Sequence, residues 1–147
     1  MCPSGWSEIG GKCYKHFKEN VTWKKARTSC QDTEAGADLL SIHSQEEQEA
    51  VAKMFDERSG WLGGQRKNDD GGGGGDYNDD DGGDKNDAFG WADGSSWDYS
   101  NWADDQPEKK KDCVEMGEDS KWYSKDCSDS RPFVCCKFSS LEYRYRL

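Results

Sequence analysis

The stretch CSDSRPFVCCKF, residues 127–138, contains three of the seven cysteines in this 147-residue chain and its clearest predicted β-strand. Side chains of a strand point to alternate faces of a sheet. Phe133 and Cys135 are therefore expected on one face, and Val134 and Cys136 on the other. The two adjacent cysteines would then lie in different environments.

The seven cysteines are spread along the chain, and no pair has the Cys-x-x-Cys spacing of a zinc site. They are Cys2, Cys13, Cys30, Cys113, Cys127, Cys135 and Cys136. Because so small a chain with few aliphatic residues needs covalent help, we expect disulfides and a secreted, extracellular protein. The chain begins Met1-Cys2 and has no signal region or membrane-length apolar stretch, so we interpret it as a mature protein with an added start methionine.

The net charge of −10 is concentrated in one segment. Residues 69–87 contain eight Asp and one Lys, which give this segment a charge of −7. With one aromatic and no aliphatic residue, it is expected to be a disordered Gly/Asp-rich insertion at about residues 68–87. The negative charge argues against nucleic acid as a partner, since phosphates would be repelled.

Two helices and a hairpin are predicted before this insertion. Residues 2–17 contain two short strand patterns separated by a glycine pair. Thr22 is the expected N-cap of a first helix, and Ser44 with Glu47 forms a capping box for a second helix. One face of the first helix carries three residues that we expect to be buried: Trp23, Ala26 and Cys30.

The chain resembles a C-type lectin-like domain in the order of its cysteines, tryptophans and Leu-Leu-Ser-Ile strand. The matching segments are GWSEIGGKCYKHF, TWKKARTSCQ, GADLLSIHSQEEQEAV, WLGG, WADGSSWDYSNW, DCVEM, KW and CSDSRPFVC. The resemblance implies an α+β fold, with two helices flanking small antiparallel sheets, a long-loop region that carries ligand sites, and stabilising disulfides. It covers residues 1–138 as a single domain and leaves 139–147 as a C-terminal tail.

The resemblance also implies how the cysteines pair. It joins Cys2 to Cys13, Cys30 to Cys135, and Cys113 to Cys127. Cys136 is left over, because seven is an odd number. We expect an intermolecular disulfide through Cys136 and hence a disulfide-linked homodimer, with a free or blocked thiol as the alternative.

Sugar-binding members of this family hold their ligand through calcium. In this chain the family's ligand triplet is Gln-Pro-Glu at 106–108, close to the Gln-Pro-Asp form that the family uses for galactose. Lys111 stands where a Glu ligand is usual, and Tyr123 with Ser124 replaces an Asn-Asp pair. Calcium takes six to eight oxygen ligands, several of them charged, so we expect no calcium or other metal cofactor at this site.

A lysine run follows the triplet and suggests a substitute for the ion. We expect an ammonium group of Lys109, Lys110 or Lys111 to neutralise Glu108 and hold the loop, since an ammonium can bridge several oxygens. Gln106 and Glu108 would then contact sugar hydroxyls. The alternative is that the lysine run is only a solvated surface.

Aromatic residues near the triplet have two expected roles. Trp97 and Tyr123 are the candidate rings for stacking on a galactose face. Trp91 and Trp102 fall on core positions of the family and are assigned to packing. Pro107 is expected to follow a cis peptide bond, as in the family.

Together these features predict a secreted, calcium-independent lectin that recognises glycans with terminal galactose or lactose. Its use would be agglutinating or defensive, as in innate immunity. Two alternatives stay open: a mineral- or cation-binding structural protein that acts through the Asp-rich loop, and a protein-recognition module that uses the long-loop face. An enzyme is not expected, because no motif supports a nucleophile and disulfide-bonded cysteines are not nucleophilic. No membrane insertion is expected.

Overall fold

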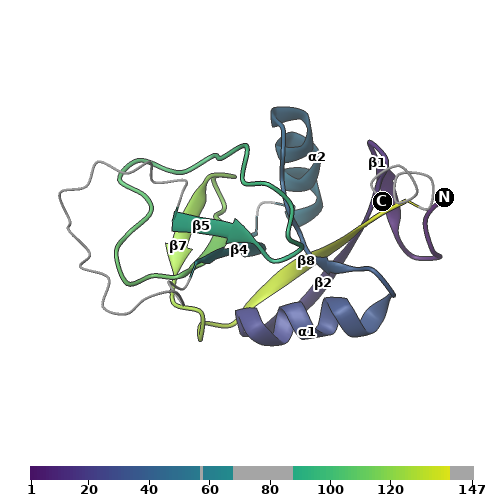
Figure 1. Cartoon of the computed structure of the whole chain (residues 1–147), viewed down its shortest axis with the longest axis horizontal. Helices are drawn as coiled ribbons and strands as arrows, with labels where there is room; N and C mark the ends of the chain where they lie inside the picture. Colours follow the sequence, from purple (N-terminus) through teal and green to yellow (C-terminus); the bar gives the residue numbers. More distant parts are fainter. Residues whose placement is uncertain (57, 68–87, 140–147) are drawn as a thin grey trace.

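The computed structural model describes residues 1–56, 58–67 and 88–139. The Gly/Asp-rich insertion at 68–87 and residues 140–147 of the tail lie outside this part, so their expected roles stay predictions. The first tail residue, Ser139, is buried and donates its backbone N–H to the carbonyl of Gly11 at 2.9 Å. The described part is an α+β domain in which two helices lie on either side of a long strand pair (Figure 1).

The strands join into one continuous sheet. They are β1 (Ser7–Ile9), β2 (Lys12–Val21), β3 (Asp38–Leu39), β4 (Gly60–Arg66), β5 (Phe89–Trp91), β6 (Cys113–Met116), β7 (Trp122–Lys125) and β8 (Arg131–Phe138). Their order is β1-β2-β8-β4-β6-β7, with β3 paired to β8 and β5 to β4. Antiparallel sheets were expected, but β4 and β8 pair in parallel, at Trp61 and Phe133. The sheet is therefore mixed.

The N-terminal hairpin forms as predicted from its glycine pair. Ile9 pairs with Lys12, so Gly10 and Gly11 make a two-residue turn with φ of 57° and 83°. A turn with positive φ at both central residues favours glycine, because it has no Cβ to clash. β2 then pairs along much of its length with β8, which brings the end of β8 beside the N-terminal hairpin (Figure 1).

Helix α1 (Trp23–Thr33) begins at the predicted cap. The Thr22 hydroxyl accepts a hydrogen bond from the Lys25 backbone N–H at 3.3 Å. The expected face of Trp23, Ala26 and Cys30 is buried. The spacing of these residues therefore orients the helix against the sheet.

Helix α2 (Gln45–Phe55) also begins as predicted, with one difference in its cap. The Ser44 hydroxyl accepts from the Glu47 backbone N–H at 3.1 Å. The Glu47 carboxylate, however, accepts from the backbone N–H of His43, one residue before the cap, at 2.7 Å. Its second oxygen is thereby left to face the sheet, where it meets Lys12 and Tyr14.

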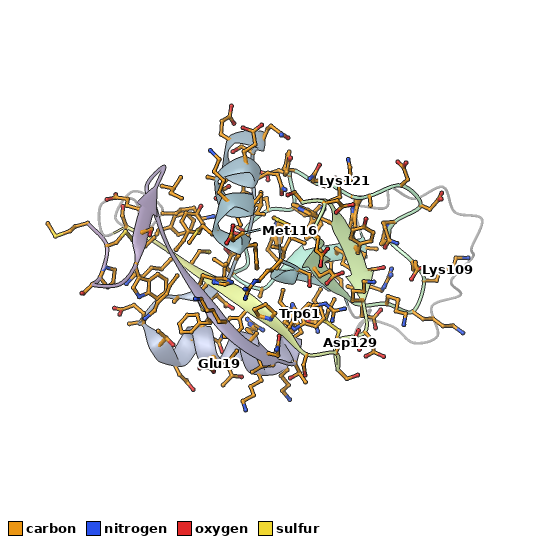
Figure 2. All side chains as sticks on the ribbon, turned by 180° about the vertical axis from the view of Figure 1, so that it is seen from behind. Glu19, Trp61, Lys109, Met116, Lys121 and Asp129 are labelled. Carbon is orange, nitrogen blue, oxygen red and sulfur yellow. A yellow bond between two sulfur atoms is a disulfide. The ribbon has the colours of Figure 1, made fainter. Side chains whose placement is uncertain are left out.

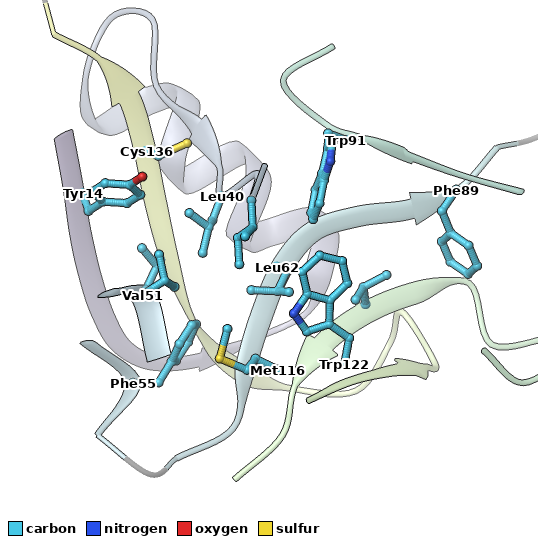
Figure 3. Close-up of a cluster of buried hydrophobic side chains, with 13 residues drawn as sticks. Tyr14, Leu40, Val51, Phe55, Leu62, Phe89, Trp91, Met116, Trp122 and Cys136 are labelled. Carbon is cyan, nitrogen blue, oxygen red and sulfur yellow. The ribbon is translucent and has the colours of Figure 1, made fainter. Parts of the chain in front are cut away.

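Strand β8 separates two hydrophobic clusters, and its alternation is the one predicted. Phe133 and Cys135 pack with Trp23 and the rest of the α1 face. Val134 and Cys136 belong to the cluster that includes Phe55 of α2 (Figure 3). Burying an aromatic or large aliphatic side chain of this kind stabilises a fold by about 1.5–3 kcal/mol.

Three disulfides connect the elements, in the pairs that the family resemblance implies. They join Cys2 to Cys13, Cys30 to Cys135, and Cys113 to Cys127. The second bond links α1 to β8 across 105 residues of sequence. In the part of the chain that the structure describes, no helix is both long and apolar enough to span a membrane.

Candidate functional site

The Gln-Pro-Glu triplet lies on a loop that is bonded to the neighbouring strand β7. The peptide bond between Gln106 and Pro107 is cis, as expected. The side-chain oxygen of Gln106 accepts from Ser124 twice, from the backbone N–H at 3.0 Å and from the hydroxyl at 3.2 Å. These bonds fix the orientation of the amide, and its NH2 group is the end that they do not use.

Glu108 is held in the loop by hydrogen bonds of its backbone. Its N–H donates to the Ser124 hydroxyl at 2.7 Å, and its carbonyl accepts from Arg66 at 2.9 Å. The residue is exposed. The triplet therefore presents an amide donor and a carboxylate acceptor from a loop whose backbone is fixed.

Arg66, at the end of β4, is the cation that ties this loop to the sheet. Its Nη2 donates to the carbonyls of Glu108 and Lys111, and its Nε donates to Asp112 Oδ1 at 2.9 Å. The guanidinium lies over the Phe89 ring, 4.7 Å from its centre, in a cation–π contact. A planar guanidinium can bond several oxygens at once, which is what this loop requires.

The lysine run itself lies at the edge of the molecule. Lys109 and Lys110 are exposed, and Figure 2 places Lys109 at the outer end of the loop, far from Trp61 at the centre. Lys110 has a φ of 66° and so marks a turn. Lys111 contributes its backbone carbonyl to Arg66. An arginine 42 residues earlier in the sequence than Glu108 thus helps to hold the loop backbone, and neutralisation of the Glu108 carboxylate by a lysine stays a prediction.

Trp97 is packed among other rings, and the sugar platform expected from it is not found there. It stacks on Trp91 with ring centroids 4.2 Å apart, and Phe89, Trp102 and Trp122 surround it within 6.2 Å. A sugar can stack only on a ring face that other rings leave uncovered. The packing expected for Trp91 and Trp102 is confirmed, and Trp97 joins them in the same cluster.

Tyr123 lies on the opposite face of β7 from the triplet. Its neighbours Trp122 and Ser124 are buried on the triplet side, and a strand alternates its side chains, so Tyr123 points away. Its hydroxyl donates to Asp119 at 2.5 Å, and this bond raises the pKa of Tyr123. The predicted grouping of Tyr123 with the triplet is therefore wrong.

The surroundings of Tyr123 form a separate depression of about 350 Å³. Its ring lies so close to Gly117 that a Cβ there would be 2.8 Å from the ring. The depression is lined mostly by charged residues, among them Glu115, Lys125 and Arg131. Glu115 is buried and accepts from Arg131, so these charges are largely paired with one another.

Cys136 is buried in the core, with 2% of its surface exposed. Burial raises the pKa of its thiol to about 11, which keeps the sulfur protonated and unreactive at neutral pH. The expected intermolecular disulfide needs this sulfur at the surface. The structure instead shows a free thiol inside the α2 cluster (Figure 3), which argues against that bridge.

A buried ion pair near the N-terminal hairpin escaped the sequence analysis. Lys12 Nζ donates to Glu47 Oε2 at 2.6 Å and to the Ser41 carbonyl at 3.0 Å, and the Tyr14 hydroxyl donates to the same Glu47 oxygen at 2.7 Å. Only 8% of the Lys12 side chain and 13% of that of Glu47 are exposed. The only sequence signal was Glu47 at its helix-capping position.

This geometry sets the charges of the cluster. Burial alone raises the pKa of Glu47, but the charge of Lys12 and the hydrogen bonds from Lys12 and Tyr14 outweigh it, and the pKa ends below its usual value. Burial and the bond to Glu47 raise the pKa of Tyr14 far above its ordinary range. The cluster therefore holds one cation, one anion and a neutral phenol.

Comparison with known protein families agrees with the fold described above. The model of the lectin C-type domain matches residues 19–137 of the chain, which is most of its length. The chain belongs to this family.

The relatives of this C-type lectin domain include proteins of different kinds. Rheacalcin-1 of Rhea americana is 32% identical, with 91% of this chain and 93% of that protein covered. One chain of the snaclec coagulation factor IX/factor X-binding protein of Gloydius halys is 34% identical, with coverage of 91% and 83%.

Solved structures share the fold over nearly the whole chain. A calcium-independent type II antifreeze protein superposes with a TM-score of 0.75 at 27% identity, covering 94% of this chain and 95% of that one. The cow carbohydrate-recognition domain of CD23 gives a TM-score of 0.75 at 30% identity, with 95% and 98% covered. The α+β fold is therefore that of C-type lectin-like domains.

Proposed function

We propose that this protein is a secreted, calcium-independent lectin that binds terminal galactose on glycans through Gln106 and Glu108. One observation carries the proposal: Ser124 and Arg66 hold the loop of these two residues by hydrogen bonds between protein groups. The amide NH2 and the carboxylate are then available as a donor and an acceptor for sugar hydroxyls. Galactose is chosen because the triplet is close to the family's galactose form.

The donor set around the loop does not suit calcium. The guanidinium of Arg66 already bonds Asp112 and two carbonyls, and a lysine stands at position 111. Calcium needs six to eight oxygens, several of them anionic, and would be repelled by a fixed cation at this place. Arg66 thus supports the part of the proposal that concerns metal independence.

Secretion is supported by the three disulfides, because such bonds persist in oxidising compartments. The homodimer expected from the odd cysteine is left out of the proposal, since Cys136 is buried. A glycan site on one chain needs no second copy.

A second candidate is recognition of a protein through the same loop face. It is favoured by two observations: the ring cluster beneath the loop leaves no stacking platform at Trp97, and a relative at 34% identity is named for binding coagulation factors. A protein partner would use the exposed charges of Glu108 and the lysine run rather than a sugar-sized pocket.

A glycan array with and without chelator tests the proposal. We expect binding to galactose-terminated glycans that EDTA leaves unchanged and that Glu108→Gln weakens at least tenfold, because the site loses its charged acceptor. Glu118→Gln is the matched control, since Glu118 is exposed beside the Tyr123 depression.

Three outcomes would count against it. Binding that requires calcium would refute metal independence, and no glycan binding with retention of a protein ligand would favour the second candidate. Saturable adsorption to calcium carbonate that is lost on deleting residues 71–84 would favour the mineral-binding alternative.

A further inference from the structure

His43 joins helix α2 to the loop that follows β5. It precedes the α2 cap, and its ring reaches across to residues 93–98. Nδ1 lies 2.6 Å from Asp98 Oδ1, and Nε2 lies 3.0 Å from Ser95 Oγ. The ring also meets the edge of Trp91, at a centroid distance of 6.3 Å. Both ring nitrogens are therefore engaged by the same loop.

The protons of this group can be counted from the neighbouring bonds. Both oxygens of Asp93 accept hydroxyl protons at 2.5 Å, one from Ser41 and one from Ser95. The backbone N–H of Ser95 donates to Asp93 as well. Ser95 has a single hydroxyl proton, and Asp93 takes it. Its oxygen can therefore only accept from His43.

Both ring nitrogens of His43 therefore face hydrogen-bond acceptors, Asp98 Oδ1 and Ser95 Oγ. Nε2 must carry a proton to bond Ser95, and Nδ1 must carry one to bond the carboxylate of Asp98. A neutral imidazole has one N–H, and only the imidazolium has two. With one proton fewer, a nitrogen lone pair faces an oxygen lone pair at one of these contacts.

We propose that His43, Ser95 and Asp98 form a proton-operated latch, which closes the loop of residues 93–98 when His43 is doubly protonated and loosens it when His43 is neutral. Histidine is the side chain whose charge ordinarily changes between pH 5 and 8, and this is the range over which the latch is tested. The proposal concerns the state of the loop and does not depend on which ligand the protein binds.

The other charged groups around the ring are mostly carboxylates. Glu47 accepts from the His43 backbone N–H, and Glu46 lines the same pocket as the ring. Lys12 is the cation on this side, and its ammonium is already paired with Glu47 at 2.6 Å. With Asp93 one hydroxyl away, carboxylates outnumber free cations around the ring.

The order Asp98–His43–Ser95 also resembles a hydrolase triad, but its protons are wrong for that role. In a triad the serine hydroxyl donates to histidine, which takes the proton as a general base. Here the hydroxyl donates to Asp93 and not to His43, so the imidazole is not placed to take its proton. The geometry fits a structural latch.

Closing of the latch is expected to affect the cluster of aromatic rings that includes Trp97. Trp97 lies within the latched segment, between Ser95 and Asp98, and stacks on Trp91. Opening the latch would loosen the restraints on either side of this indole. We therefore expect pH to change the exposure of the cluster as well as the loop.

Amide hydrogen exchange tests the latch in the intact protein. The protection factor, which corrects for intrinsic exchange chemistry, should rise roughly two- to fivefold for the Ser95 amide between pH 7.5 and pH 5.5, the gain of a partly exposed ion pair. Ser95 is suitable because its backbone N–H donates to Asp93 within the same loop, at 2.9 Å.

Matched variants and an internal control isolate the cause. Asp98→Asn removes the charge at an exposed position and should abolish the pH dependence, whereas Ser96→Ala should keep it. In ¹⁵N spectra at pH 5.5 both ring nitrogens of His43 should be protonated. His16 should gain its second ring proton only at a lower pH than an ordinary imidazole does, because burial, with help from Lys18 and Arg58, lowers its pKa.

Three results would overturn the proposal. They are equal Ser95 protection at both pH values, an unchanged pH dependence in Asp98→Asn, and a His43 ring that carries a single proton at pH 5.5.

Discussion

Replacing Lys12 by methionine is expected to remove a large part of the stability of this domain. Methionine keeps most of the length of the side chain but removes the ammonium, which donates to Glu47 at 2.6 Å and to the Ser41 carbonyl at 3.0 Å. The Glu47 carboxylate, 13% exposed, would remain inside with bonds only from Tyr14 and the His43 backbone.

The magnitude follows from the burial of the pair. Removing one partner of a buried ion pair costs about 3–5 kcal/mol, because the other charge stays without compensation. A domain of this size is stable by about 5–15 kcal/mol, so Lys12→Met should approach the limit of folding. The double variant Lys12→Met/Glu47→Gln should be more stable than Lys12→Met alone, since no buried charge is left unpaired.

Urea unfolding with the disulfides intact measures these differences, and pH gives an independent check. The pKa of Glu47 is lowered in the folded protein, so its charge stabilises the fold above the unfolded value of about 4.3. This contribution is lost as pH falls through the folded pKa. The gap between wild type and Glu47→Gln should therefore be full at pH 7 and close on acidification. A loss below about 1 kcal/mol for Lys12→Met would refute the reasoning, because exposed pairs contribute that little.

Other changes test separate parts of the fold. Cys136 should not react with a thiol reagent at pH 7.5 in the native protein, and should react at the rate of unfolding in urea, since burial keeps its pKa at about 11. Replacing Cys30 and Cys135 by alanine should lower the free energy of unfolding by about 4–5 kcal/mol, because their bond closes a loop of 105 residues; a change under 1 kcal/mol would contradict this. Gly63→Ala should cost about 1–3 kcal/mol in a thermal melt, since its Cβ would be 2.7 Å from a backbone carbonyl, while Gly90→Ala, whose Cβ meets only a lysine side chain, should cost less.

Local signals in the sequence were sufficient for most of the fold. Thr22 and Ser44 cap their helices because a cap depends on a hydroxyl and the next few amides. The two faces of β8 follow from strand alternation alone. The same rule, applied to Trp122–Ser124, would also have separated Tyr123 from the triplet, because a buried Trp122 fixes the parity of the strand.

The parts of the site that were missed depend on contacts distant in sequence. Arg66 reaches Glu108 because β4 pairs with β6. Nothing in the sequence near the lysine run indicates that a distant arginine bonds to this loop. Lys12 meets Glu47 only once the hairpin packs on α2. Trp97 looked accessible in a turn-rich segment, yet four rings from two strands and a loop pack around it. Such outcomes require the tertiary fold.

The ladder between β4 and β5 has a practical consequence for protein engineering. Arg66 pairs with Phe89, and the Lys67 N–H donates to the Ala88 carbonyl at 2.8 Å, so the chain leaves the sheet and re-enters it at adjacent points. The sheet thus fixes the two points between which the connecting peptide must run, and for a flexible guest, doubling the length adds about 0.6 kcal/mol of closure entropy. This junction is therefore a place at which epitopes, affinity tags or reporter domains can be inserted between two adjacent strand ends.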